Sequence, residues 1–212
     1  LIQPNNPTKL GHAFAGWYTN LTLTTPFTFG SMPDENLTLY ANWTVNQYTI
    51  AFEMNGGNPI EDLTLDYDQN IAITSEISKT GHTFIGWYID STLISAFILT
   101  KMPAQDLTLY AKWQINQYTI GFNSDGGSTV AAITQDYGTV VTQPEDPTRE
   151  GYTFTGWDQE IPVTVPASDM ELMAQWTINQ YTISFDSDGG SAVASIKQDY
   201  GTAVTQPEDP TR

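Results

Sequence analysis

Gly151-Tyr152-Thr153-Phe154-Thr155-Gly156-Trp157 is the stretch of sequence that decides the fold, because it recurs at a fixed spacing. Similar stretches are Gly81-His82-Thr83-Phe84-Ile85-Gly86-Trp87 and Gly11-His12-Ala13-Phe14-Ala15-Gly16-Trp17, each 70 residues before the next. A period of this length is typical of an array of like modules. It argues against catalysis, since enzymes seldom repeat one active site in every tandem copy.

A second marker, Asn-Gln-Tyr-Thr-Ile, shows where one module ends and the next begins. It starts at Asn46, Asn116 and Asn179, at intervals of 70 and then 63 residues, so the third copy is shorter. We therefore predict the C-terminal part of a module, a complete module, a complete but shorter module, and the N-terminal part of a module. Their bounds are 1–46, 47–116, 117–179 and 180–212.

The two partial modules are complementary. One hypothesis is that they associate head-to-tail between copies of the chain by strand donation. The alternative is that both are frayed ends without fixed structure. The chain begins with Leu1 rather than Met and stops at Arg212 inside a repeated motif, so we interpret it as a piece of a longer polypeptide.

Composition narrows the function further. The chain has 24 acidic and 7 basic residues and a net charge of −17, which opposes binding to nucleic acids and to anionic membranes. It has no cysteine, which excludes disulfides and thiolate metal sites. No stretch reaches the roughly 20 apolar residues that a membrane span needs, so we expect no membrane insertion within this segment. The 6 Trp, 11 Tyr and 9 Phe residues supply the burial that such small modules need.

Alternating apolar residues predict strands. Tyr118–Phe122 alternates and leads into Asp125-Gly126-Gly127, which indicates a strand followed by a tight turn in which glycine takes a positive φ. In 107–113 one face carries Leu107, Leu109, Ala111 and Trp113, and the other carries Thr108, Tyr110 and Lys112. We further predict a short strand near 139–141, one helical turn at Pro147–Gly151, and a helical stretch around Ser91–Thr100.

These motifs resemble the Listeria–Bacteroides repeat, the B-repeat type of internalin-like surface proteins. The resemblance rests on Asp125-Gly126-Gly127, Asp136-Tyr137-Gly138, the stretch from Pro147 to Trp157, and the closing Trp176, and it covers all of the chain. It implies small β-grasp (ubiquitin-like) modules of about 70 residues, and therefore an α+β, β-rich fold. It also implies export to the bacterial cell surface, and it supplies no catalytic residue.

The two histidines are candidate ligands or bases. His12 and His82 occupy one repeat position, and Tyr152 replaces them in the third copy. A zinc site needs several converging ligands and a catalytic triad needs a base in each copy, so neither fits. We expect these histidines to be partly buried, hydrogen-bonded packing residues.

Acidic residues suggest calcium binding or glycoside hydrolysis. The turns at Asp125 and at Asp186-Ser187-Asp188 do not match an EF-hand loop, and hairpin chemistry explains their glycines. Glu145 and Asp146 align with the neutral Asn5 and Asn6, which argues against a carboxylate pair. Lys–Asn crosslinks are not indicated either, since the lysines do not recur with a consistent partner. We assign no catalytic, cofactor-binding or metal-binding residue and expect no cofactor.

The paired tryptophans raise the possibility of sugar binding, since flat aromatic faces stack on sugars. However, Trp43, Trp113 and Trp176 align with leucines of the buried face, and Trp17, Trp87 and Trp157 alternate with phenylalanine as core residues do. We therefore predict that the indole rings pack in the core.

Together these observations predict a non-enzymatic tandem-repeat segment of an extracellular bacterial cell-surface protein. It would act as a stalk or spacer, or as an adhesion array in which repetition gives avidity. The alternative is a glycan- or host-protein-binding module with one site per repeat. Its partner would be an unknown protein or glycan.

Overall fold

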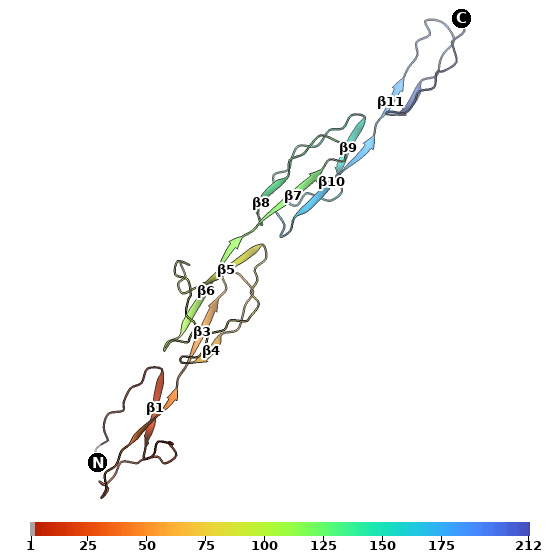
Figure 1. Cartoon of the computed structure of the whole chain (residues 1–212). Helices are drawn as coiled ribbons and strands as arrows, with labels where there is room; N and C mark the ends of the chain where they lie inside the picture. Colours follow the sequence, from red (N-terminus) through yellow and green to blue (C-terminus); the bar gives the residue numbers. More distant parts are fainter. Residues whose placement is uncertain (1–2) are drawn as a thin grey trace. The chain divides into compact units, whose positions relative to one another are not determined.

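The computed structural model describes residues 3–212, and its strands form four separate sheets (Figure 1). The chain divides into two compact units, Leu1–Gln114 and Ile115–Arg212. Each unit contains one four-stranded and one two-stranded sheet. No helix occurs within residues 3–212, so the predicted α+β class is wrong and the fold is all-β.

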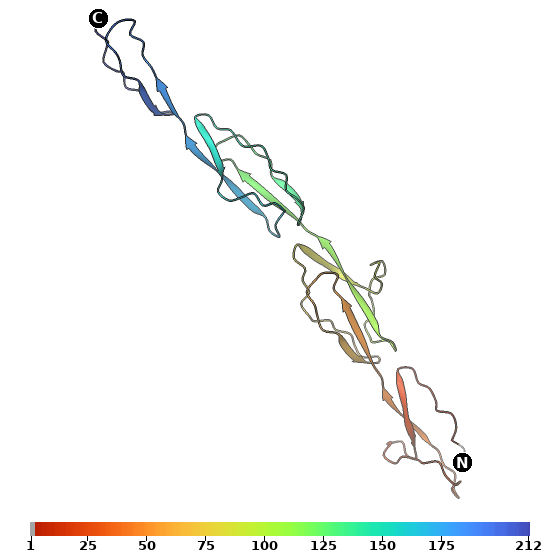
Figure 2. The same cartoon turned by 180° about the vertical axis from the view of Figure 1, so that it is seen from behind.

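The four-stranded sheet of the first unit has the strand order β4-β3-β6-β5. Its strands are β3 (Gln47–Glu53), β4 (Leu63–Asp66), β5 (His82–Tyr88) and β6 (Leu107–Ile115). β3 pairs antiparallel with β4 and parallel with β6, where Ile50 lies opposite Leu107. The sheet is therefore mixed, with the first and last strands of the module side by side at its centre (Figure 2).

The four-stranded sheet of the second unit repeats this arrangement in the order β8-β7-β10-β9. Its strands are β7 (Gln117–Asn123), β8 (Ile133–Asp136), β9 (Tyr152–Trp157) and β10 (Met170–Ile178). β7 and β10 are the parallel pair, with Ile120 opposite Met170. The two sheets thus have one topology, as the repeated sequence requires.

The two-stranded sheets belong to the partial modules. They contain β1 (His12–Tyr18) with β2 (Tyr40–Val45), and β11 (Gln180–Ile183) with β12 (Ile196–Asp199). Ile183 is 41% exposed, whereas its counterparts Ile120 and Ile50 are fully buried at 0%. Residues 180–212 therefore present to solvent the face that forms the core of a complete module.

The core of each complete module follows from the alternation in the sequence. Leu109 and Ala111 are both 0% exposed, whereas Thr108 on the opposite face is exposed, so the predicted faces are confirmed. The fully or nearly fully buried clusters are Ile50, Leu65, Met102 and Leu109 in the first unit, and Ile120, Val141, Val165 and Leu172 in the second. Burying each such side chain stabilises the fold by about 1.5–3 kcal/mol relative to exposure.

The predicted hairpin turns are confirmed. Asn55 and Gly56 have φ values of 48° and 87°, and Asp125 and Gly126 have 46° and 85°. Positive φ at both central residues is the geometry of a type I′ turn, whose twist matches that of the flanking strands. The N–H of Gly57 closes the turn by donating to the Met54 carbonyl at 3.0 Å.

The helical turn expected at Pro147–Gly151 is absent, and with it the helix that a β-grasp fold requires. Pro144 and Pro147 remove two backbone donors and disfavour helical conformation in the residues before them. The segment is instead tied to the hairpin turn: Ser128 N donates to Thr148 O at 2.8 Å, and Thr148 N donates to Ser128 Oγ at 2.9 Å. The connection between β8 and β9 is therefore extended.

The helical stretch expected around Ser91–Thr100 is also wrong, because Asp90 organises a loop there. Its carboxylate accepts hydrogen bonds from the backbone N–H groups of Ile94 and Ser95, at 3.2 and 2.7 Å, and from the Thr92 hydroxyl. Aspartate side chains that bind nearby backbone N–H groups compete with helix formation. Leu93 has a φ of 56°, which would interrupt a right-handed helix. These hydrogen bonds hold the pKa of Asp90 at about 2, below its usual 3.8.

The short strand predicted near 139–141 is present as an isolated bridge between Val140 and Thr164, flanked by backbone hydrogen bonds from Val141 N to Val163 O and from Val165 N to Thr139 O. The strand of this region lies earlier, at β8, where Ile133–Asp136 pairs with β7.

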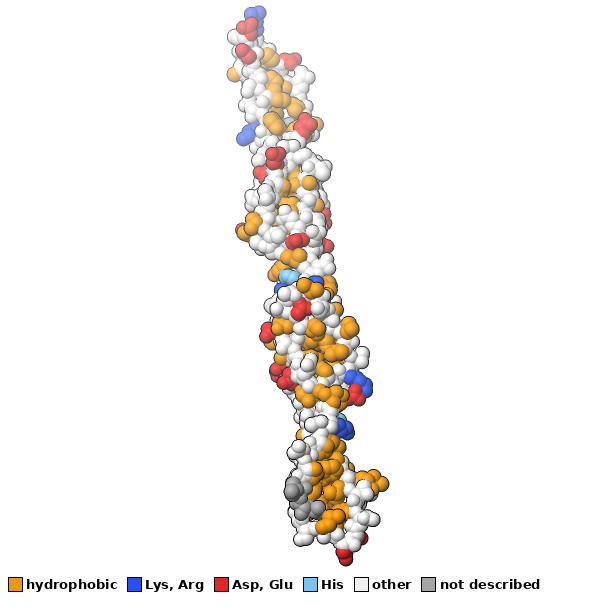
Figure 3. Space-filling view, turned by 90° about the vertical axis from the view of Figure 1, so that its left-hand side faces the viewer, with side chains coloured by type: hydrophobic (Ala, Val, Ile, Leu, Met, Phe, Trp, Pro, Cys, Tyr) orange, Lys and Arg blue, Asp and Glu red, His pale blue; other side chains and the backbone are white. Residues whose placement is uncertain are grey.

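Acidic side chains are scattered over the face drawn in Figure 3 and do not gather into one patch. This distribution agrees with a solvated acidic surface. Within residues 3–212 there is no helix with the length and apolar character that a bilayer crossing requires.

Candidate functional site

The junction between modules within each unit is built around one asparagine. β2 ends at Val45 and β3 begins at Gln47, so Asn46 alone separates them. Asn46 N donates to Gly11 O at 2.9 Å, and Asn46 O accepts from Tyr67 N at 2.9 Å. One residue therefore binds the preceding module through its N–H and the following module through its carbonyl.

The second unit repeats this junction. Asn179 N donates to Gly151 O and Asn179 O accepts from Tyr200 N, both at 2.8 Å. Because two independent junctions have the same four hydrogen-bonding groups, the geometry is a property of the repeat. The sequence carries the same residue types at Gly81, Asn116 and Tyr137.

A tyrosine ring packs on bare glycine backbone at each of these two junctions. A Cβ on Gly11 would lie 2.1 Å from Tyr67 Cγ, and one on Gly151 would lie 2.0 Å from Tyr200 Cδ1. Both glycines also have positive φ, at +68° and +75°, which L side chains rarely adopt. Glycine is thus required at positions 11 and 151 for space and for conformation.

The second junction also holds a charged neighbour. The charge of Glu150 beside Tyr200 raises the pKa of that phenol.

His12 belongs to the first of these junctions, and His82 holds the equivalent position in the repeat. The His12 ring lies edge-to-face on Tyr67, with ring centroids 5.8 Å apart, and its Nδ1 lies 2.8 Å from Leu10 O. His82 Nδ1 lies 2.8 Å from Thr80 O. Both side chains are half-buried, which confirms the predicted packing role.

The four tryptophans of the two complete modules are half-buried and fall into two groups. Trp87 and Trp157 pack against the core clusters, as predicted, with ring centroids 4.9 and 5.0 Å from Phe52 and Phe122.

Trp113 and Trp176 pack instead against the hairpin turns. Their Nε1 groups donate to Met54 O at 2.8 Å and to Ser124 O at 3.0 Å. The core prediction is therefore correct only in part for them, because each indole closes a turn at the edge of the core.

A basic residue also closes the hairpin turn of each complete module, a contact that was not predicted. Arg149 NH1 donates to Asp125 O at 2.9 Å, and its guanidinium lies 4.0 Å from the centroid of the Tyr152 ring. Lys79 Nζ donates to Asn55 O at 2.8 Å at the equivalent place. The repeated position holds Lys9, Lys79, Arg149 and Arg212. A positive charge recurs at this position, as lysine in two copies and as arginine in the other two. A comparison of the lysines alone does not reveal it.

The acidic turns do not assemble a metal site. Within residues 3–212, no group of three or more His, Asp or Glu side chains is placed to hold a metal ion. Asp125 lies beside Arg149, with Oδ2 3.7 Å from NH1, and Asp186 Oδ1 accepts from Asp188 N at 3.1 Å. These carboxylates stabilise their own turns.

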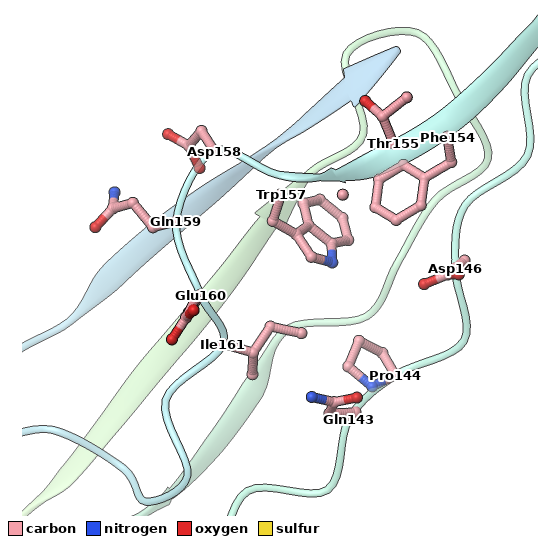
Figure 4. Close-up of a pocket in the computed structure, with 11 residues that line it drawn as sticks. Gln143, Pro144, Asp146, Phe154, Thr155, Trp157, Asp158, Gln159, Glu160 and Ile161 are labelled. Atoms are coloured by element: carbon pink, nitrogen blue, oxygen red, sulfur yellow. The ribbon is translucent and has the colours of Figure 1, made fainter. Parts of the chain in front are cut away.

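An open groove of about 700 Å³ lies on the four-stranded module of the second unit (Figure 4). Phe154 and Trp157 of β9 lie between its two sides. One side is the loop after β9, with Asp158 and Glu160, and the other is the connection between β8 and β9, with Asp146. The structure thus brings Asp146, considered above only as a partner of Glu145, next to the aromatic rings.

Comparison with known proteins agrees with the modular geometry. The sequence profile of the Listeria-Bacteroides repeat domain matches residues 1–42, 48–112, 118–175 and 181–212, which is more than half of the chain. The chain belongs to the Listeria-Bacteroides repeat family. This family is typical of non-enzymatic surface proteins.

Relatives with Listeria-Bacteroides repeats are bacterial. The chain is 37% identical over its whole length to a Gly-rich membrane protein of Evansella cellulosilytica, of which it covers 26%. It is 38% identical over 96% of its length to a membrane protein of the same organism, of which it covers 32%. It is 36% identical over 72% of its length to internalin H of Listeria monocytogenes, of which the match covers 30%. The chain therefore spans at most about a third of the length of these relatives.

Proposed function

We propose that this chain is a non-enzymatic spacer or adhesion array in an extracellular, bacterial cell-surface protein. The observation that carries the proposal is the module junction. Asn46 and Asn179 each make one hydrogen bond backward and one forward, and Tyr67 and Tyr200 each pack on a glycine. Such contacts restrict bending between neighbouring modules, unlike a flexible Gly/Ser linker.

The family supports this role. Tandem Listeria-Bacteroides repeats also occur in internalin H. The histidines, the acidic turns and four of the tryptophans have structural partners, which favours a non-enzymatic role.

The test is the distribution of distances across one junction. Spin labels at the exposed positions Ala15 and Glu61 of the full chain should give one narrow distance by pulsed electron resonance. Gly11→Ala should broaden that distribution, because the new Cβ meets the Tyr67 ring. Gly30→Ala is the matched control, since a Cβ there meets nothing within 4 Å. A broad distribution in the parent chain would refute the spacer.

The second candidate is a glycan- or protein-binding module with one site in every repeat. The Phe–Trp pair does recur, at Phe84 with Trp87 and at Phe154 with Trp157. The polar residues around the pair recur only in part, since Asp146 corresponds to Glu76 but Asp158 corresponds to Tyr88. A ligand site common to every copy is therefore the weaker proposal.

A further inference from the structure

The lining of the groove on the second unit's complete module recurs only in part in the other complete module, where Glu76 and Asp90 stand 70 residues before Asp146 and Glu160. Its polar residues Gln143, Asp158 and Gln159 stand 70 residues after Ile73, Tyr88 and Ile89. In the longer module, Tyr88 is covered by Lys112, whose Nζ lies 4.7 Å from the ring centroid.

The shorter connection after β9 also changes what lies beside the tryptophan. In the longer module Phe97 belongs to the core layer with Trp87, and its N–H donates to Trp87 O at 2.8 Å. In the shorter module the smaller Ile161 packs on the core with Trp157. The seven-residue deletion and the polar substitutions therefore occur together, at one groove.

The aromatic part of the groove is held in place before any ligand arrives. The Trp157 ring lies 5.0 Å from the Phe122 ring and 5.3 Å from the Phe154 ring, centroid to centroid. Figure 4 shows the indole nitrogen directed into the space between the two sides of the groove. The indole nitrogen of Trp176, in contrast, points to the hairpin turn and donates to Ser124 O at 3.0 Å.

The rim of the groove is rich in hydrogen-bond acceptors. Asp158 is fixed by two bonds to Met173: Asp158 N donates to Met173 O, and Met173 N donates to Asp158 Oδ1, both at 2.8 Å. The carboxylates of Asp146 and Glu160 are exposed on opposite sides of the groove. No Lys, Arg or His belongs to the lining residues that the structure describes. Such a rim repels phosphates, sulfates and uronic acids and favours a ligand with many donors.

We propose that this groove binds a glycan that carries no acidic groups. A pyranose ring has an apolar C–H face, which fits the indole and phenyl rings, and hydroxyl edges that donate to carboxylates and amides. The proposal goes beyond the spacer function, because a spacer with fixed junctions is possible whether or not the groove binds sugar.

The test is a titration of the full chain with defined oligosaccharides, followed by NMR of the six indole N–H signals. Cellohexaose and a chitosan hexamer represent neutral and amino sugars, and a hyaluronan hexamer represents acidic ones. We expect one site per chain, with Kd on the order of 1 mM or tighter for at least one non-acidic probe. The single indole signal that shifts should be that of Trp157, assigned with Trp157→Phe.

A matched pair of variants localises the binding. Asp146→Ala with Glu160→Ala removes two exposed acceptors of the rim, which should weaken binding about tenfold. Glu145→Ala removes the neighbouring exposed charge, which is outside the groove lining, and should leave Kd unchanged. Both variants should keep the parent melting temperature, since no hydrogen bond within residues 3–212 involves these three carboxylates.

Four results would overturn the proposal. They are no binding by either non-acidic probe, equal binding of hyaluronan, several equivalent sites per chain, and an equal loss of affinity in Glu145→Ala. Binding of a lysine-rich peptide in place of the sugars would assign the acidic rim to a basic protein partner and would also overturn it.

Discussion

Gly127→Ala tests whether the half-buried Trp176 closes the hairpin turn of its module. A Cβ at this position would lie 2.5 Å from Trp176 Cζ2 and 3.1 Å from Thr148 O, so the indole must move. Moving it breaks the hydrogen bond from Nε1 to Ser124 O, which contributes about 0.5–1.5 kcal/mol. It also disturbs the ring contact with Phe154, which contributes a similar amount.

The alanine itself offsets part of this loss, because it reduces the entropy of the unfolded chain by about 0.4–1 kcal/mol. We therefore expect a net destabilisation of roughly 1–2 kcal/mol. For a domain of this size, that lowers the melting midpoint by about 4–16 °C. The shift should appear in the transition of the module that contains β7 to β10, measured by calorimetry of the full chain.

Gly121→Ala is the matched control in the same module. Its Cβ would meet Glu171 Cγ at 3.6 Å, which is an ordinary contact, so the midpoint should stay constant or rise slightly. If Gly127→Ala melts within about 1 °C of this control, the indole is not packed on the turn and the reasoning is refuted.

Four further predictions concern single features. Trp113→Ala should destabilise its own module by about 2–4 kcal/mol in a denaturant titration, because it leaves a cavity beside the turn. An unchanged midpoint would mean that the indole is exposed to solvent. Hydrogen bonds hold the pKa of Asp90 at about 2, so its contribution to stability should be complete above about pH 4 and be lost as the pH falls toward 2. A titration of the Asp90 carboxyl with a midpoint near 3.8 would contradict this. A polypeptide of residues 117–179 should fold alone with cooperative melting, and a non-cooperative trace would contradict the proposed module bounds. If residues 1–46 and 180–212 associate head-to-tail, light scattering should show mass rising with concentration, whereas a constant single-chain mass would refute that association.

The strands and turns were predictable because they depend on local patterns. The alternation around Leu109 identifies the buried face directly, and Asn55-Gly56 has the residue types that a type I′ turn demands. Strand pairing across a module is not local. Repetition, in contrast, is visible in the sequence itself. The modules were therefore easier to recognise than the strand pairing within them.

The helices were mispredicted because side chains competed with backbone periodicity. Pro147 can open a helix, but the hydrogen bonds between Ser128 and Thr148 hold that segment extended. Asp90 accepts the backbone N–H groups that a helix from Ser91 would have used internally. Ser128 is 20 residues from Thr148 and cannot be identified from neighbouring residues, whereas Asp90 directly precedes Ser91 and is a local competitor for the helix.

The candidate groove was still less predictable. Asp146 and Trp157 lie on separate elements, and only the fold places them beside one another. In the sequence, the groove is indicated only by a seven-residue deletion that occurs together with the change from Tyr88 to Asp158. The paired tryptophans had been considered for sugar binding as a set, whereas the structure distinguishes Trp157 by the polar residues around it.

The parallel pairing at the centre of each complete module has a mechanical consequence. The chain enters through β3 and leaves through β6, and these strands lie side by side with Ile50 opposite Leu107 and Glu53 opposite Tyr110. Tension applied at both ends of the module would pull the two strands in opposite directions along their length. The ladder between them would then be loaded in shear, so that its bonds must rupture together and cannot unzip one at a time. β7 and β10 repeat the arrangement, so both complete modules would resist a pulling force in the same way.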